Sequence, residues 1–159
     1  MKKIDKVTGN IWDFHKKGYY VVLSMDAVKD KQKAKLSNWT ARQIRDNVRT
    51  ISDDQLLKDW SIICKNNKVN GIPPVMINSK ARILLFPTKY LNESKCSFEM
   101  MLNSFEILKN TLNLMKDDKF VINYIGSNTG DLSIKDSRDL LEAYLEGFDN
   151  ILICDISSK

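Results

Sequence analysis

Residues 126–130 are the part of the chain whose composition best fits phosphate binding. They read Gly-Ser-Asn-Thr-Gly, follow a run of apolar residues and precede a helical pattern. Glycines let backbone N–H groups turn toward a phosphate and approach it closely, and the neighbouring hydroxyls can donate further hydrogen bonds. An ordinary strand-to-helix turn that needs positive φ at two positions would have the same composition, so the segment alone leaves both interpretations open.

A second group of side chains suited to phosphate lies on a helix predicted over residues 38–49. Arg42, Arg45 and Arg49 are three and four residues apart and therefore share one helix face, next to Trp39. Arginine pairs with phosphate oxygens and stacks on bases. These residues support the hypothesis of a surface that contacts RNA, and the alternative is an ordinary solvated amphipathic helix.

The remaining reactive residue types form no catalytic or metal-binding pattern. His15 is the only histidine, and Asp13, two residues before it, would not face it on a helix. We interpret His15 as a surface or capping residue. Three widely spaced cysteines without a Cys-x-x-Cys or Cys/His spacing favour reduced thiols over a zinc site or a disulfide. We therefore predict no catalytic residue, no metal and no cofactor.

Length and composition indicate one folded α/β domain over residues 1–159. A 43% hydrophobic share is sufficient for a core, and no apolar run approaches the roughly 20 residues that a membrane span needs. The charged start lacks the apolar region of a signal peptide, so we expect a cytoplasmic protein. The net charge, 25 − 20 = +5, is compatible with polyanionic partners, although a solvated surface is the simpler explanation.

The hydrophobic pattern predicts strands alternating with helices. Short apolar runs typical of strands buried on both faces occupy residues 19–23, 82–86, 120–125 and 151–154, and residues 75–77 form a hairpin with the second of these. Three segments have a helical pattern. The first follows a capping box at Ser52 and Gln55, the second spans residues 97–115, and the third runs from Asp136 as N-cap to Gly147. We therefore predict a mixed central sheet with helices on both faces, a three-layer α/β/α fold.

In such sheets ligands bind beyond the carboxyl ends of the strands. Two segments leave predicted strands at that edge, residues 24–41 and 126–132. We expect the functional site to lie between them.

Several segments, in this order and spacing, resemble the macro-domain family. Residues 7–11 (Val-Thr-Gly-Asn-Ile) resemble its Gly-Asp-Ile signature, with Asn10 in the place of the aspartate. Residues 86–89 (Phe-Pro-Thr-Lys) and 125–132 are similar to the strand-loop-helix and the second phosphate loop of a phage and bacterial branch. The resemblance covers roughly residues 4–156 and implies a three-layer α/β/α fold that binds ADP-ribose.

The resemblance also implies a site for ADP-ribose or a related nucleotide. The adenine would lie near Asn10 and Ile11. The distal ribose and the diphosphate would lie near the end of the strand predicted over residues 19–23 and near the loop that follows it. Residues 126–130 would close over the phosphates from the other side. The implied ligand-binding residues are Asn10, Ile11, Ser24, Asp26, Ser37, Asn38, Trp39, Ala41, Gly126, Ser127, Asn128, Thr129, Gly130 and Leu132.

The departures from the family pattern suggest a weakened site. Asp26 stands where the family has an asparagine, Trp39 and Asn128 where it has glycines. An indole would fill space that the diphosphate needs, and a carboxylate would repel the diphosphate. We therefore expect a non-catalytic module that binds ADP-ribose-like nucleotides. The alternatives are a module that has lost nucleotide binding and binds RNA or a protein partner, and a weak ADP-ribosyl hydrolase.

Overall fold

The computed structural model describes residues 4–28, 38–66, 75–90, 98–124 and 133–155, without the side chains of residues 38–41, 66 and 134. Within these residues the chain forms a six-stranded sheet in the order β1-β6-β5-β2-β4-β3. The pairs β1–β6, β6–β5, β5–β2 and β2–β4 are parallel, and β3 is antiparallel to β4. The predicted mixed sheet is therefore confirmed.

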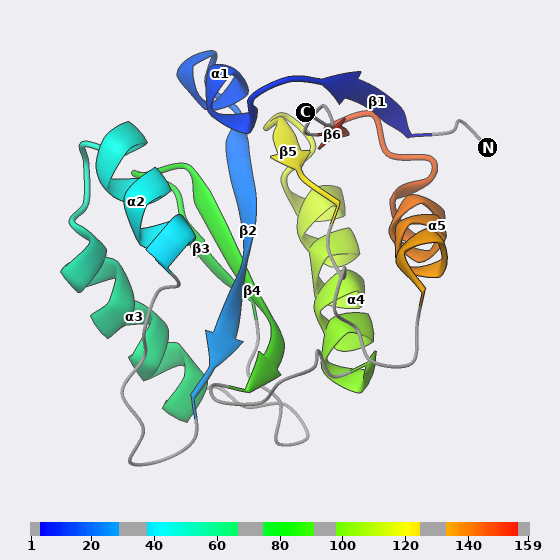
Figure 1. Ribbon diagram of the computed structural model, residues 1–159. Coiled ribbons are helices and arrows are strands. Elements are labelled where there is room, and N and C mark those ends of the chain that lie inside the picture. The colour runs from blue at the N-terminus through cyan, green and yellow to red at the C-terminus, as the bar shows by residue number, and fades with distance from the viewer. Residues whose placement is uncertain (1–3, 29–37, 67–74, 91–97, 125–132, 156–159) are drawn as a thin grey trace.

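The elements follow one another as strands and helices along the chain. Their bounds are β1 Asp5–Thr8, α1 Ile11–Lys16, β2 Tyr20–Ala27, α2 Asn38–Asn47, α3 Asp53–Asn66, β3 Met76–Asn78, β4 Ile83–Tyr90, α4 Phe98–Leu114, β5 Phe120–Ile122, α5 Ile134–Leu145 and β6 Ile151–Asp155. Figure 1 shows α2 and α3 on one side of the sheet and α4 and α5 on the other, so the predicted three layers are present.

The apolar runs form strands here because the sheet is covered on both faces. Val21, Leu23 and Met25 of β2 pack into a core with α1, α2 and α3, whereas Tyr20 and Val22 pack into a second core with α4 and α5. Successive side chains of a strand point to opposite faces, so a strand between two helical layers needs apolar residues at nearly every position. This is why β2 shows no alternation in sequence.

Two predicted helix starts need correction. Ser133, not Asp136, is the N-cap of α5, since the Ser133 side chain accepts from the backbone N–H of Asp136 at 3.0 Å. The capping box of α3 is only half formed. Ser52 accepts from the backbone N–H of Gln55 at 3.1 Å, but the Gln55 side chain donates to Asp59, one turn further along the helix.

The interpretation of His15 as a surface or capping residue is wrong. Its side chain lies in α1, is only 7% exposed, and its Nε2–H donates to the carbonyl oxygen of Ala81 at 2.8 Å. Arg82, which has a φ of +53°, donates in turn from Nη2 to the carbonyl of His15. His15 and Arg82 thus fasten the turn between β3 and β4 onto α1.

Acidification is expected to destabilise the fold through His15. Burial lowers its pKa below the ordinary value of 6.5, and the Arg82 charge acts in the same direction, while the hydrogen bond to Ala81 opposes them. The unfolded chain then takes up a proton before the folded one, so this contribution to stability is complete above pH 6.5 and is lost as the pH falls below it. Urea unfolding of the wild type and of His15→Gln, which keeps a donor but does not titrate, checks this. We expect a smaller loss of stability between pH 7.5 and 5.5 in the variant; an equal loss would assign the effect to other groups.

Candidate functional site

The carboxyl ends of three neighbouring strands meet at one edge of the sheet. In β2, Val22 is level with Leu84 of β4 and with Ile122 of β5, and all three strands run in the same direction. The chain therefore leaves β2, β4 and β5 at the same edge, which is the edge where open α/β sheets bind ligands. Seven of the predicted ligand residues that follow these strands lie outside the described residues: Ser37, Gly126, Ser127, Asn128, Thr129, Gly130 and Leu132.

The end of β2 carries two of the predicted ligand residues. Ser24 is exposed, and Asp26 is half-buried at 31% side-chain exposure. A shift of register between Met25 and Asp26 brings Asp26 level with Lys89 of β4. Lys89 Nζ then lies 3.2 Å from Asp26 Oδ2, with the lysine side chain 25% exposed.

This ion pair corrects the expected electrostatics of the site. Asp26 alone would repel a diphosphate, but Lys89 offsets its charge, so together they present no net charge to a ligand. In the sequence, Lys89 stands out only as part of the family motif at residues 86–89. Its pairing with Asp26 could not be predicted, because that pairing depends on the register shift between β2 and β4. The presence of a lysine and an aspartate on two neighbouring strands does not by itself predict that they form an ion pair.

Helices from both layers fix the strand ends that carry this pair. Trp60 of α3 is fully buried, and its indole N–H donates to the backbone oxygen of Asp26 at 2.9 Å. On the opposite layer, buried Ser104 of α4 donates to the backbone oxygen of Pro87 at 2.7 Å. The first bond holds the backbone of Asp26 itself, and the second holds the backbone two residues before Lys89. The geometry of Asp26 and Lys89 is therefore held by rigid elements.

The predicted adenine end lies at the end of β1. Gly9 donates from its backbone N–H to the carbonyl of Asp155, and Asn10 then caps α1, its Oδ1 accepting from the Trp12 N–H at 2.9 Å. Asn10 is exposed, and its oxygen keeps a second lone pair for a ligand donor. The Ile11 side chain is 4% exposed and packs in the core, so its backbone is the part nearer to a surface ligand.

The end of β5 adds residues that sequence reasoning missed. Tyr124 follows β5, and the Arg138 guanidinium of α5 lies 4.7 Å from the centroid of its ring. Burial raises the pKa of Tyr124, as do the charges of Glu142 and Asp155, while Lys6 and Arg138 oppose them. Tyr124 is therefore a neutral phenol that can donate or accept, and a cation lies over its face.

The predicted residues of the first phosphate loop form part of a helix. Asn38, Trp39 and Ala41 make up the beginning of α2, where only the backbone is described. The helix predicted over residues 38–49 is thus confirmed as α2, but it ends at Asn47, so Arg49 lies two residues past its end.

The described groups at this edge suit binding of a polar, phosphorylated ligand. They offer a carboxylate, an ammonium, a phenol, a guanidinium, a hydroxyl and an amide, which are donors and acceptors for sugar hydroxyls and phosphates. Within the described ranges, no group of three or more His, Cys, Asp or Glu residues could hold a metal ion. The helices of those ranges include none long and apolar enough to cross a membrane.

The sequence matches no family model and no curated protein. Solved structures do resemble it. The macrodomain of Mycobacterium tuberculosis DarG superposes with a TM-score of 0.66 at 10% identity, covering 100% of both chains. The macrodomain of Thermus aquaticus DarG gives 0.64 at 12% identity, over 99% of this chain and 100% of the other. Thermosipho africanus DarTG in complex with ADP-ribose gives 0.63 at 12% identity, over 97% of this chain and 42% of the larger one.

These matches run over the whole chain, and the sheet of mixed strands between two helical layers is the architecture that the sequence resemblance implied. At 10–12% identity the similarity is one of fold. The chain has the macrodomain fold.

Proposed function

We propose that the chain binds ADP-ribose or a closely related nucleotide at the carboxyl edge of β2, β4 and β5, without hydrolysing it. The observation that supports this most is the fold match over the full chain to macrodomains, together with a neighbour of the same fold in complex with ADP-ribose. Ligands of open α/β sheets bind at this edge, and the described polar residues gather there.

In the proposed complex, each group acts according to its chemistry. Asp26 accepts from the hydroxyls of the distal ribose, while Lys89 offsets the carboxylate and attracts the diphosphate. Backbone N–H groups of residues 37–41 and 126–130 supply the diphosphate contacts, and Asn10 accepts from the adenine amino group. The family pattern has a glycine where this chain has Trp39, so we expect a lower affinity than a glycine-rich loop would give.

Thermal shift and titration calorimetry with ADP-ribose test this proposal. A ligand that binds only the folded state at 100 times its Kd stabilises it by about 2.7 kcal/mol. For a domain of this size, that is a rise in Tm of roughly 5–10 °C. AMP and ribose 5-phosphate, which each carry part of the ligand, should give smaller shifts. No heat and no shift at millimolar ADP-ribose would contradict binding.

The absence of hydrolysis has its own test. When the protein is mixed with an ADP-ribosylated substrate, we expect no ADP-ribose to be released. Release at a rate proportional to protein concentration would establish the hydrolase alternative while leaving the binding site in place.

A further inference from the structure

Three arginines, two on α2 and one just after it, have no part in the nucleotide site proposed above. Arg42, Arg45 and Arg49 are all exposed. At 100° per residue, Arg42 and Arg45 lie about 60° apart on α2, and Arg49 follows two residues past the end of the helix at Asn47. They therefore form a narrow basic stripe along α2 and just past its end, which we call the arginine stripe.

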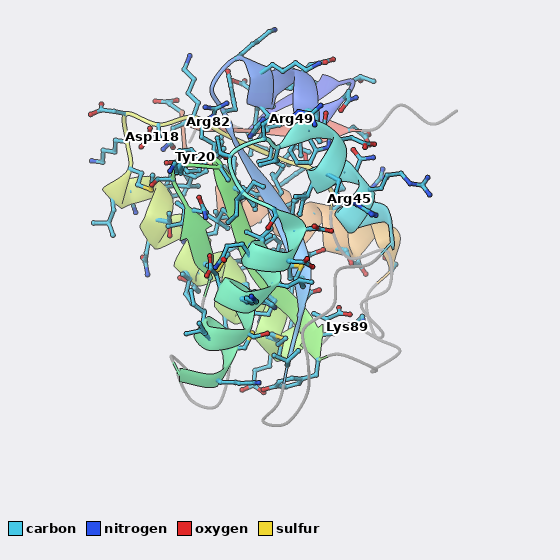
Figure 2. All side chains as sticks on the ribbon, turned by 90° about the vertical axis from the view of Figure 1, so that its left-hand side faces the viewer. Tyr20, Arg45, Arg49, Arg82, Lys89 and Asp118 are labelled. Atoms are coloured by element: carbon cyan, nitrogen blue, oxygen red, sulfur yellow. The ribbon has the colours of Figure 1, made fainter. Side chains whose placement is uncertain are left out.

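The position of the arginine stripe is fixed by the core beneath it. Ile44 is fully buried and Val48 is 6% exposed, and both pack into the core cluster that α3 also contacts. Because these two side chains anchor the inner face of the helix, α2 cannot rotate the arginines away from solvent. Figure 2 shows Arg45 on α2 and Arg49 just past the end of that helix, at the face of the molecule that α2 and α3 form.

Nearby carboxylates leave the stripe able to bind an anion. Arg45 Nε lies 3.7 Å from Asp53 Oδ2, beyond hydrogen-bond distance, with the arginine side chain 61% exposed. Exposed ion pairs of this kind contribute little free energy, so a phosphate can compete with Asp53. Arg45 and Arg49 also border a hollow of about 370 Å³ at the turn between α2 and α3, which can admit an anion beside both guanidinium groups.

Asp46 limits the shape of the partner. It is exposed and lies about 40° from Arg42, on the side of the stripe away from Arg45. A broad polyanion such as a duplex would bring the phosphates of its second strand toward this carboxylate. A single strand can follow the arginines and avoid it.

We infer that the arginine stripe binds a single-stranded nucleic acid. Arginine pairs with the backbone phosphates and stacks on base faces, and those faces are accessible only when the bases are unpaired. This inference does not depend on ADP-ribose binding, because none of the three arginines is among the residues assigned to that site.

Fluorescence anisotropy with a 20-nucleotide uridine RNA tests the inference. We expect the variant Arg42→Gln/Arg45→Gln/Arg49→Gln to bind at least about tenfold more weakly than the wild type at 50 mM salt. Each lost phosphate contact on a single strand reduces the slope of log K against log salt by about 0.7, so the slope should fall by about 2. Glutamine is a good helix former, and the sites are exposed, so the variant should fold normally.

A matched control separates a local surface from net charge. Lys109→Gln/Lys116→Gln/Lys119→Gln removes three charges from α4 and the turn after it, in the opposite layer. Binding close to wild type in this control, with the loss in the arginine variant, supports the stripe. An equal loss in both variants, an unchanged arginine variant, or tighter binding of the duplex form of the same RNA would overturn it. ADP-ribose titration should give the same heats for both variants.

Discussion

Lys89→Ala is expected to weaken ADP-ribose binding by at least about tenfold, which corresponds to about 1.4 kcal/mol. The substitution removes the ammonium group 3.2 Å from Asp26 Oδ2 and leaves the carboxylate without this partner at the edge where the diphosphate would lie. Two effects then add, since the ligand loses an attractive charge and meets a repulsive one. Titration calorimetry at low salt, where screening is weakest, measures the change most clearly.

Two further variants identify the cause of that loss. Asp26→Asn removes the repulsive charge and releases Lys89 for the ligand, so its affinity should equal or exceed that of the wild type. Lys80→Ala changes an exposed lysine in the turn before β4 begins, at the other edge of the sheet, and should have no effect. If Lys89→Ala bound ADP-ribose as tightly as Lys80→Ala, the ion pair would not be part of the ligand site.

Trp60→Ala is expected to reduce the free energy of unfolding by about 3–5 kcal/mol, the usual cost of truncating a buried tryptophan. Trp60 is fully buried in the core between α3 and the sheet, and its indole N–H satisfies the backbone oxygen of Asp26. Because small domains are stable by only about 5–15 kcal/mol, this variant is at risk of unfolding. Urea unfolding measures the difference.

Trp60→Phe provides a version of the same test that should remain folded. It keeps most of the apolar volume but removes the hydrogen bond, for which we expect a cost of about 1–3 kcal/mol because a partly buried acceptor loses its partner. The end of β2 should then be less well held, and ADP-ribose affinity should fall with stability. Ile62→Ala, at a side chain of α3 that is 56% exposed, is the control and should change stability little. A Trp60→Phe variant as stable as this control would show that the bond to Asp26 contributes nothing.

Much of the architecture could be predicted from sequence because burial on both faces leaves a strong signal. The strands β2, β4 and β6 and the helices α3 and α4 coincide with continuous apolar runs or with regular helical stripes. By contrast, β1 and α1 were not predicted. β1 is an edge strand with a largely exposed pattern, and α1 has only six residues, too few for a helical period to be recognised.

The details that decide the site could not be predicted from composition or spacing. Asp26 and Lys89 meet only because the register shifts within β2, and His15 is buried only because the turn before β4 folds against α1. Ser133 and Asp136 are both good capping residues, and the choice between them depends on where the backbone enters α5. Such pairings arise from tertiary structure, which the residues near each position do not encode.

The most direct test of ligand binding at the carboxyl edge is an NMR titration that follows backbone amide signals as ADP-ribose is added. The largest chemical-shift changes are predicted at Asn10, at Ser24 and Asp26, and at Lys89, with little change at Arg82 and Asp118 near the opposite edge. Changes confined to that opposite edge, or no changes at saturating ligand, would contradict the proposed site.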